Sequence, residues 1–299
     1  SPHHVGIPQH RERFFIVGSS FGLNHFEWPK TMSEQTSIFD YLDHSPAGAR
    51  KLEPEKTRVL DLWQEFLDCI PKDASLPSWP IWSMEFGATY PFEEKTPFAS
   101  TSTELDDSKG SFGVQLRNLS KEKKLQKLPR YARTEENEFP TWKKNYIRKN
   151  RAFYLQYKDS IDSVVKKISR LNVASWQKFE WNVQGGERCL RNYIIQFRGS
   201  GVRIKKTDFF PSLVTVSTQI PILGWSERYI TPQEGARIQS MGDLKLPVNT
   251  GTCFSALGNA VNVEVVRKIA SALVNDRGPE NGRSPSVDNS KLNVNHAGT

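Results

Sequence analysis

Cysteine is scarce in this chain, with three residues among 299, at positions 69, 189 and 253. Three distant cysteines are too few for a disulfide scaffold and lack the short spacing of metal ligands. The six histidines show no metal-binding spacing either. The sequence therefore excludes a disulfide-stapled or metal-ribbon fold, and we expect a reducing, cytoplasmic setting with no bound metal.

Long hydrophobic runs are also lacking, because no apolar stretch approaches the roughly 20 residues of a membrane helix. Hydrophobic residues make up 37% of the chain and charged residues 25%, and the mean hydropathy is −0.57. This composition predicts a globular protein without a membrane partner. The chain opens on Ser1 with no signal sequence, which favours a piece of a longer protein.

Acidic residues are fewer than basic residues, with 33 Asp and Glu against 41 Lys and Arg. The net charge is therefore +8, and the pI is near 9.3. The excess is concentrated in two segments. Residues 117–151 hold 12 basic against 4 acidic residues, and residues 187–206 hold 6 against 1. A charge run is often only a solvated helix face. Two basic segments with aromatic residues and turn glycines between them favour a surface for a polyanion, most often nucleic acid.

Hydrophobic periodicity predicts a small set of elements. Residues 12–18 read as a buried strand, with a core from Phe14 to Val17, and residues 59–70 read as a helix that Pro71 ends. Further helices are expected at 151–170, 231–240 and 259–274, and strands near 191–197 and 212–218. Residues 75–110 should form a long loop packed on its own aromatic rings. The tail at 276–299 has the composition of a disordered segment.

Three short motifs carry chemical information. The first, Pro8-Gln9-His10-Arg11-Glu12-Arg13, places two arginines on one side of the expected strand. Their guanidinium groups offer forked donors to a phosphate, carboxylate or carbonyl oxygen. An exposed strand edge with a local ion pair is the equally simple alternative.

The other two motifs begin helices by their residue pattern. Thr231, Pro232 and Glu234 form a capping box, with Arg228 and Arg237 on either side. The last motif, Gly258-Asn259-Ala260-Val261, has small residues that let a ligand approach the backbone. An ordinary capped core helix explains that pattern as well.

In this order and spacing, the three motifs resemble the carboxy-terminal motifs of the DNA cytosine-5 methyltransferase family. The region between them resembles the target-recognition domain of the bacterial branch. Its most similar stretches are residues 176–182, 198–203 and 210–214. The amino-terminal motifs of the family are absent: the glycine-rich cofactor loop, the Pro-Cys nucleophile and the Glu-Asn-Val segment. The resemblance covers most of residues 1–275.

This resemblance implies an α/β fold: the carboxy-terminal part of a Rossmann-like methyltransferase sheet domain with an inserted, irregular α+β target-recognition domain. Residues 1–20 and 226–275 would belong to the catalytic domain. Residues 21–225 would form the insertion and recognition domain, and 276–299 a disordered tail. The function implied is methyl transfer from S-adenosyl-L-methionine to C5 of a cytosine flipped out of specific double-stranded DNA.

The resemblance also implies roles for single residues. Arg13, with Arg11 and Gln9, would be catalytic, and Arg13 would aim its charge at the cytosine O2. Arg228, Thr231 and Glu234 would hold the recognition domain against the catalytic core. The cofactor would contact Asn259, Ala260 and Val261, while most of its site would lie on the amino-terminal part. Candidate DNA-binding residues are Arg198, Arg203, Lys205, Lys206, Ser212 and Leu213. Arg198 and Arg203 suit guanine edges, and most other cations suit phosphates.

Because the nucleophile is absent, we expect this chain to be inactive until an amino-terminal half completes it, in cis or in trans. One alternative is a naturally separate DNA-recognition subunit of a split methyltransferase. Another is a DNA-binding protein without methyl transfer. A bacterial-type cytoplasmic enzyme of this kind is also expected to have a cognate restriction enzyme as a partner.

Overall fold

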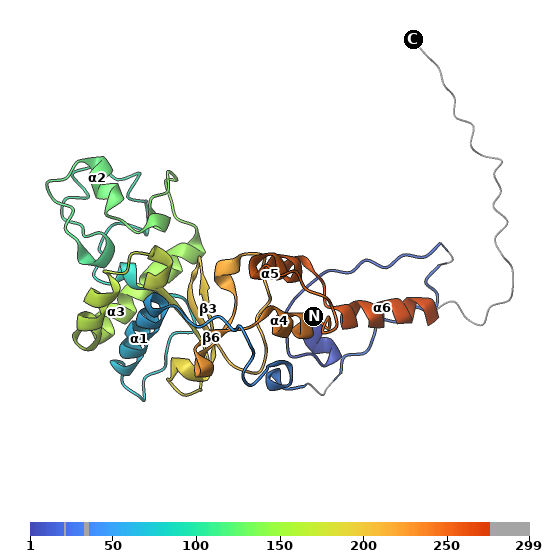
Figure 1. Cartoon of the computed structure of the whole chain (residues 1–299). Coiled ribbons are helices and arrows are strands. Elements are labelled where there is room, and N and C mark those ends of the chain that lie inside the picture. Colours follow the sequence, from blue (N-terminus) through green and yellow to red (C-terminus); the bar gives the residue numbers. More distant parts are fainter. Residues whose placement is uncertain (21, 33–35, 276–299) are drawn as a thin grey trace, which may run out of the picture.

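The computed structural model describes residues 1–20, 22–32 and 36–275, and the expected tail lies outside this range. The fold is mixed α/β. A six-stranded sheet stands between two groups of helices, with α1 (Pro54–Asp68) and α3 (Thr141–Ile168) on one side (Figure 1). On the other side lie α4 (Pro232–Ile238), α5 (Thr250–Asn259) and α6 (Val263–Asn275).

Helices α1 and α3 form as their periodicity predicts. Pro54 occupies the first turn of α1, and the residues facing the sheet are buried: Val59, Leu60, Trp63, Phe66 and Leu67. The expected helix at 59–70 is confirmed. The second expected helix begins ten residues earlier than the prediction, at Thr141, and ends at Ile168.

The sheet is built mostly from the middle of the chain. Its strand order is β1-β2-β4-β3-β5-β6, and every neighbouring pair is antiparallel except β2 and β4. The strands are β1 (Ile81–Trp82), β2 (Lys178–Asn182), β3 (Ile194–Arg198), β4 (Gly201–Lys205), β5 (Ile222–Leu223) and β6 (Arg228–Tyr229).

Strands β3 and β4 form a tight hairpin in which Arg198 pairs with Gly201. Gly201 has a φ of 146°, and a Cβ there would lie 3.0 Å from the Lys178 carbonyl. Only glycine fits this close approach. The hairpin confirms the strand expected near 191–197.

One sheet face is apolar and packs on α1 and α3. Phe179, Trp181, Val202 and Ile204 lie on this face, and the Phe179 ring stacks on Trp63 at 4.7 Å between centroids. The same buried cluster continues into α4 and α5 through Phe254. The two helix groups therefore share one continuous core.

A smaller core lies beyond β1, around the short helix α2 (Lys121–Gln126). It gathers Trp82, Tyr90, Leu116, Leu128 and Phe139 with their neighbours. The buried Glu85 accepts hydrogen bonds from the hydroxyls of Tyr90 and Tyr131 and pairs with Arg151. The aromatic residues of 75–110 therefore pack partly on later segments, rather than only on one another.

Short 3-10 turns connect these elements. They span Pro2–Val5 (η1), Ile38–Tyr41 (η2), Ser83–Glu85 (η3), Ser111–Gly113 (η4), Arg130–Ala132 (η5), Ala174–Gln177 (η6), Leu190–Asn192 (η7), Ser217–Gln219 (η8) and Gly224–Ser226 (η9). None of the helices among the described residues has the length and apolar character that a bilayer span requires.

Three sequence predictions are wrong. Residues 12–18 form no strand, and Phe14 and Ile16 are fully exposed. No strand is found at 212–218. Gly258 lies in the last turn of α5, and the final helix begins only at Val263. Strand formation needs a neighbouring strand, and the described residues provide none beside 12–18.

Candidate functional site

Arg11 joins three distant segments of the chain. Its side chain is 2% exposed. Nη1 donates to the Leu213 carbonyl at 2.6 Å and to Ser212 Oγ at 3.0 Å. Nη2 donates to the carbonyls of Gly258 at 2.7 Å and Ala260 at 2.5 Å. Burial, reinforced by the nearby Arg13, lowers the pKa of Arg11 to about 10, so it keeps its charge at neutral pH.

Gln9 lies beside this clamp and is completely buried. Its backbone forms a parallel bridge with Phe210, next to the hydrogen bond from Phe210 N to the Pro8 carbonyl. Neither polar atom of its side-chain amide has a hydrogen-bond partner among the described residues. A buried amide without partners is energetically unfavourable, so Gln9 is held here by the surrounding backbone.

Arg13 has the opposite environment, because its side chain is exposed and, among the described residues, donates only to the Glu12 carbonyl, at 2.7 Å. It lines a small cavity of about 10 Å³ together with Arg11, Phe15 and Val261. The structure therefore brings together residues of the first and last motifs, which are about 250 positions apart in the chain.

The last motif differs from its expected geometry. Asn259 ends α5, Ala260 caps it, and the carbonyl of Ala260 is used by Arg11. The expectation that Gly258 opens a helix to a ligand is wrong. A Cβ at Gly258 would lie 2.5 Å from the Thr215 backbone nitrogen, so this chain's own backbone makes the close approach.

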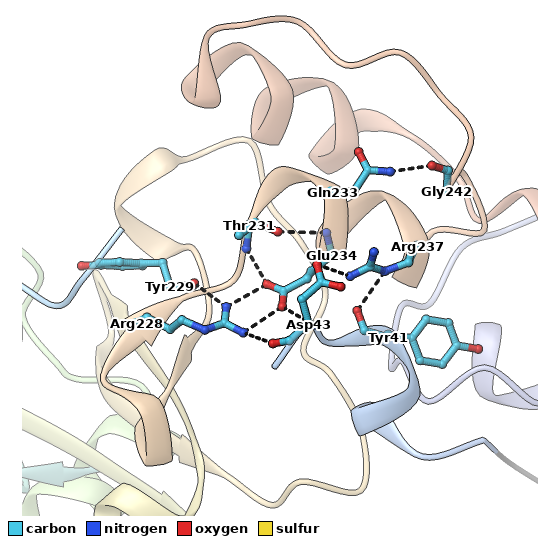
Figure 2. Close-up of polar contacts among 9 residues, drawn as sticks. All are labelled: Tyr41, Asp43, Arg228, Tyr229, Thr231, Gln233, Glu234, Arg237 and Gly242. Carbon is cyan, nitrogen blue, oxygen red and sulfur yellow. Dashed lines mark hydrogen bonds and ion pairs between the residues drawn. The ribbon is translucent and has the colours of Figure 1, made fainter. Parts of the chain in front are cut away.

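Arg228 and Glu234 form a buried bidentate ion pair (Figure 2). Nη1 of Arg228 donates to Glu234 Oε2 at 2.9 Å, and Nη2 donates to Oε1 at 2.8 Å. Glu234 also accepts from the backbone nitrogen of Thr231 at 2.7 Å, while Thr231 Oγ1 accepts from Glu234 N. The predicted capping box is confirmed, and it includes the arginine as a third member.

The segment around Asp43 completes this network, and no sequence motif pointed to it. The Asp43 backbone donates to Glu234 Oε1 at 2.9 Å, and its carbonyl accepts from Arg228. Arg237 donates to Asp43 Oδ2 at 2.7 Å and to the Tyr41 carbonyl at 3.1 Å. Figure 2 shows both arginines directed at this segment, Arg228 from β6 and Arg237 from the last turn of α4. These residues fix α4 to an early segment of the chain, a structural role.

A surface of the sheet that we call the basic face lies opposite α1 and α3. By strand register it carries Lys178, Glu180, Gln196, Arg198, Arg203 and Lys205. The side chains of Arg198 and Lys205 form no hydrogen bond or ion pair with any described residue, although their backbones pair in the sheet. Burial lowers the pKa of both groups, and repulsion from Arg203 adds to it. The predicted DNA-binding residues Arg198, Arg203 and Lys205 thus share one surface.

The remaining predicted DNA-binding residues have different environments. Lys206 is exposed just beyond the end of β4. Ser212 is half-buried and its hydroxyl binds Arg11, while Leu213 is 2% exposed. A buried Leu213 side chain has no surface to offer DNA, so its contribution is to the Arg11 clamp.

Most cations of the basic segment 117–151 are used inside the chain. Lys124 is 1% exposed and binds Asp106 at 2.8 Å, and Arg148 forms an ion pair with Glu93 at 2.6 Å. Other members with internal acceptors are Arg117, Lys121, Arg133, Lys143, Lys144 and Arg151. This segment is therefore less available to an outside anion than its charge indicates.

His3, His10 and Glu12 place their ligand atoms within 4.8 Å of one another, which the sequence spacing did not predict. The pKa of His10 is lowered by burial and then by repulsion from Lys205. The same positive charge disfavours a cation at this cluster.

The surroundings of Cys253 and Cys69 do not favour a reactive thiolate. Cys253 is buried, and its Sγ donates to the Pro247 carbonyl at 2.9 Å. Burial and the adjacent carboxylates of Glu65 and Asp68 raise the pKa of the Cys69 thiol. A raised pKa disfavours the reactive thiolate.

A cavity of about 680 Å³ lies between α3 and residues 85–113. Its wall includes Glu85 and Arg151, which bind each other, and it contains none of the predicted site residues. By volume it could hold a small molecule, but Glu85 and Arg151 already bind each other and groups of Tyr90 and Tyr131.

The chain is similar to known proteins over most of its length. Residues 2–275 match the family model described as C-5 cytosine-specific DNA methylase. The Type II methyltransferase M.AluI of Cellulosimicrobium cellulans is 34% identical over 142 residues, which cover 44% of this chain and 26% of that protein. The match thus spans about a quarter of this relative's length. No solved structure matches. With nearly all of its described residues inside the family model, the chain belongs to the C-5 cytosine-specific DNA methylase family.

Proposed function

We propose that this chain is the carboxy-terminal portion of a DNA cytosine-5 methyltransferase. Completed by an amino-terminal half, in cis or in trans, it transfers a methyl group from S-adenosyl-L-methionine to C5 of a flipped cytosine in a specific double-stranded DNA sequence. The observation that carries the proposal is the Arg11 clamp. It brings the first motif, Ser212-Leu213 and the last motif together, and leaves the Arg13 guanidinium exposed beside them.

In this proposal Arg13 donates to the cytosine O2 and stabilises the negative charge that spreads over the ring. Arg11 fixes the backbone segment that carries Arg13. Arg13 suits this role because its only hydrogen bond in the described part of the chain is to a neighbouring carbonyl. The backbone of Gln9 also steadies this segment, through its bridge with Phe210.

The residues present do not form a complete cofactor site. The cavity between Arg13 and Val261 measures about 10 Å³, whereas ligand pockets commonly measure about 300 Å³ or more. Asn259, Ala260 and Val261 therefore contribute at most an edge. We place most of the cofactor site on the amino-terminal half. In this proposal the present chain contacts the cytosine O2 and the DNA.

Residues 12–18 supply the surface for that half. Phe14 and Ile16 are exposed, and this segment lacks a strand neighbour among the described residues. A strand added by an amino-terminal sheet would pair its backbone groups and cover both side chains. Residues 1–20 and 226–275 would then join the catalytic domain, and residues 21–225 would form the recognition domain.

The test supplies the chain with an amino-terminal half that carries the Pro-Cys nucleophile, taken from a relative such as M.AluI. Pure halves, alone and mixed, are incubated with labelled S-adenosyl-L-methionine and mixed-sequence DNA. We expect cytosine labelling only in the mixture. Labelling by this chain alone would contradict the proposal, and so would a folded, associated mixture that transfers nothing.

The alternative is a naturally separate DNA-recognition subunit, with no catalytic residue of its own. The basic face favours this alternative, because it needs no amino-terminal half to bind DNA. Arg13 separates the two, because substituting it lowers the rate of methyl transfer only under the first proposal. A partner restriction enzyme stays an expectation from the family resemblance.

A further inference from the structure

Arg203 lies at the centre of the basic face. It is on β4, directly between Glu180 of β2 and Gln196 of β3. Because side chains alternate along a strand, all three point to the same side of the sheet. The Arg203 side chain is 31% exposed, and that of Glu180 is 7% exposed.

The contact between Arg203 and Glu180 uses only one edge of the guanidinium. Nε of Arg203 donates to Glu180 Oε2 at 2.5 Å. Among the described residues, neither Nη1 nor Nη2 of Arg203 has a hydrogen-bond acceptor. The two terminal amino groups are a planar pair of donors, and this pair matches two adjacent acceptors on a planar partner.

The cations around this pair lack matching carboxylates. Lys178, Arg198 and Lys205 share the basic face, on which Glu180 is the one acidic residue, and Glu180 already binds Arg203. Lys178 lies over the rings of Trp82 and Tyr131 without an ion pair to any described residue. Half-buried charges without partners favour a bound anion such as the DNA backbone.

We propose that Glu180 is a positioning residue that fixes Arg203 so that its two terminal amino groups read O6 and N7 of a guanine in the target DNA. This inference rests on the proposed function, because it assigns a base-reading task within the same DNA interface. The neighbouring cations Lys178, Arg198 and Lys205 contact phosphates.

Arg198 is the other arginine on this face, but nothing among the described residues orients it. It lies at the hairpin end of β3, opposite Gly201, and no described carboxylate binds it. An unrestrained arginine loses more side-chain entropy when it binds a base edge. Glu180 lowers this entropy cost for Arg203, so Arg203 is better suited than Arg198 to recognise a base.

The first experiment needs no variant. The full chain selects from a random DNA duplex library, and the enriched guanines are then replaced one at a time by 7-deazaguanine, which lacks N7. We expect at least one replacement to weaken binding by about tenfold, in the range of one bidentate base contact. If every replacement leaves affinity unchanged, the inference is overturned.

The second experiment uses Arg203→Lys and Glu180→Gln in the same assay. We expect Arg203→Lys to remove the preference for guanine at one position of the DNA site. At that position, replacing guanine by 7-deazaguanine should then no longer change the affinity. Glu180→Gln should weaken that preference several-fold. Because it removes a negative charge, it should also keep or increase affinity for random-sequence DNA, which a purely structural defect would not do.

Arg191→Lys is the matched control, because Arg191 is also held by carboxylates, those of Asp61 and Glu227, but lies outside the basic face. It should leave the selected sequence unchanged. Wild-type guanine preference in both Arg203→Lys and Glu180→Gln would overturn the inference while leaving the proposed function intact. A folded wild-type chain that binds no DNA would overturn both.

Discussion

Arg11 and Arg13 stand two positions apart, and the structure gives them opposite environments. Arg11 is buried with four acceptors, whereas Arg13 is exposed with one. The same residue type is therefore a buried structural link at position 11 and an exposed side chain at position 13. Two predictions separate these roles.

The first prediction concerns stability. Arg11→Lys keeps the charge but cannot span acceptors on the two segments 212–213 and 258–260, and Arg11→Ala leaves the buried carbonyls unpaired. We expect Arg11→Ala to lower the free energy of unfolding by about 3 kcal/mol or more, since each unpaired buried group costs about 1–3 kcal/mol. Arg11→Lys should lose less. Urea unfolding measures both, and unchanged midpoints would contradict the clamp.

The second prediction concerns rate. In the enzyme reconstituted from both halves, Arg13→Ala should slow single-turnover methylation about a hundredfold, because one preorganised donor is worth about 2.7–4 kcal/mol in the transition state. DNA affinity should change much less, because the phosphate contacts dominate it. Arg13→Lys keeps the charge and should recover part of the rate.

If both Arg13 variants methylate DNA at the wild-type rate, Arg13 has no catalytic role. A joint collapse of rate, affinity and folded protein would make its role structural. Urea unfolding of the free chain distinguishes these results, because the exposed Arg13 should contribute little to its stability.

At the scale of elements, α5 touches residues 214–215 so closely that only glycine fits between them. We expect Gly258→Ala to destabilise the chain by about 1–3 kcal/mol or more, the usual range for overpacking. Gly199→Ala is the matched control, because a Cβ there meets nothing within 4 Å. Equal unfolding midpoints for the two variants would contradict the close approach.

Local sequence predicted those elements whose signals are local. The apolar spacing of α1 and the capping residues Thr231 and Glu234 are each complete within one element, and the structure confirms both. The strand at 12–18 depended on a neighbour. Its residues Phe14 and Ile16 have the right composition for a buried strand, but pairing decides whether a strand forms.

At the scale of the whole molecule, DNA affinity should come from the basic face more than from residues 117–151. If about 5 phosphates are neutralised, log K should fall with log salt at a slope near −4 to −5. Changing Lys178, Arg198 and Lys205 to Gln should reduce the magnitude of the slope by about 1 for each phosphate that is no longer neutralised.

The matched comparison is the quadruple change of Lys123, Lys124, Arg148 and Lys149 to Gln. Two of these residues, Lys124 and Arg148, already form ion pairs inside the chain, so the quadruple variant should alter the slope less than the triple variant. Lys124 is buried, and its substitution will also lower stability, so Arg148→Gln and Lys149→Gln are measured separately. A flat salt titration of the folded wild-type chain would contradict DNA binding by this chain.

The sequence by itself determined the family, through three motifs in order, and the existence of α1, α3 and α4. It also determined that two arginines occur in the first motif, but not which of them is buried. Only the tertiary structure decided that Arg11 reaches residues 213 and 258–260, that Asp43 completes the Arg228–Glu234 pair, and that Glu180 holds Arg203. These contacts join residues between 23 and 249 positions apart. Charge and periodicity act over a few residues, whereas such pairs depend on how the sheet and helices bring distant segments together.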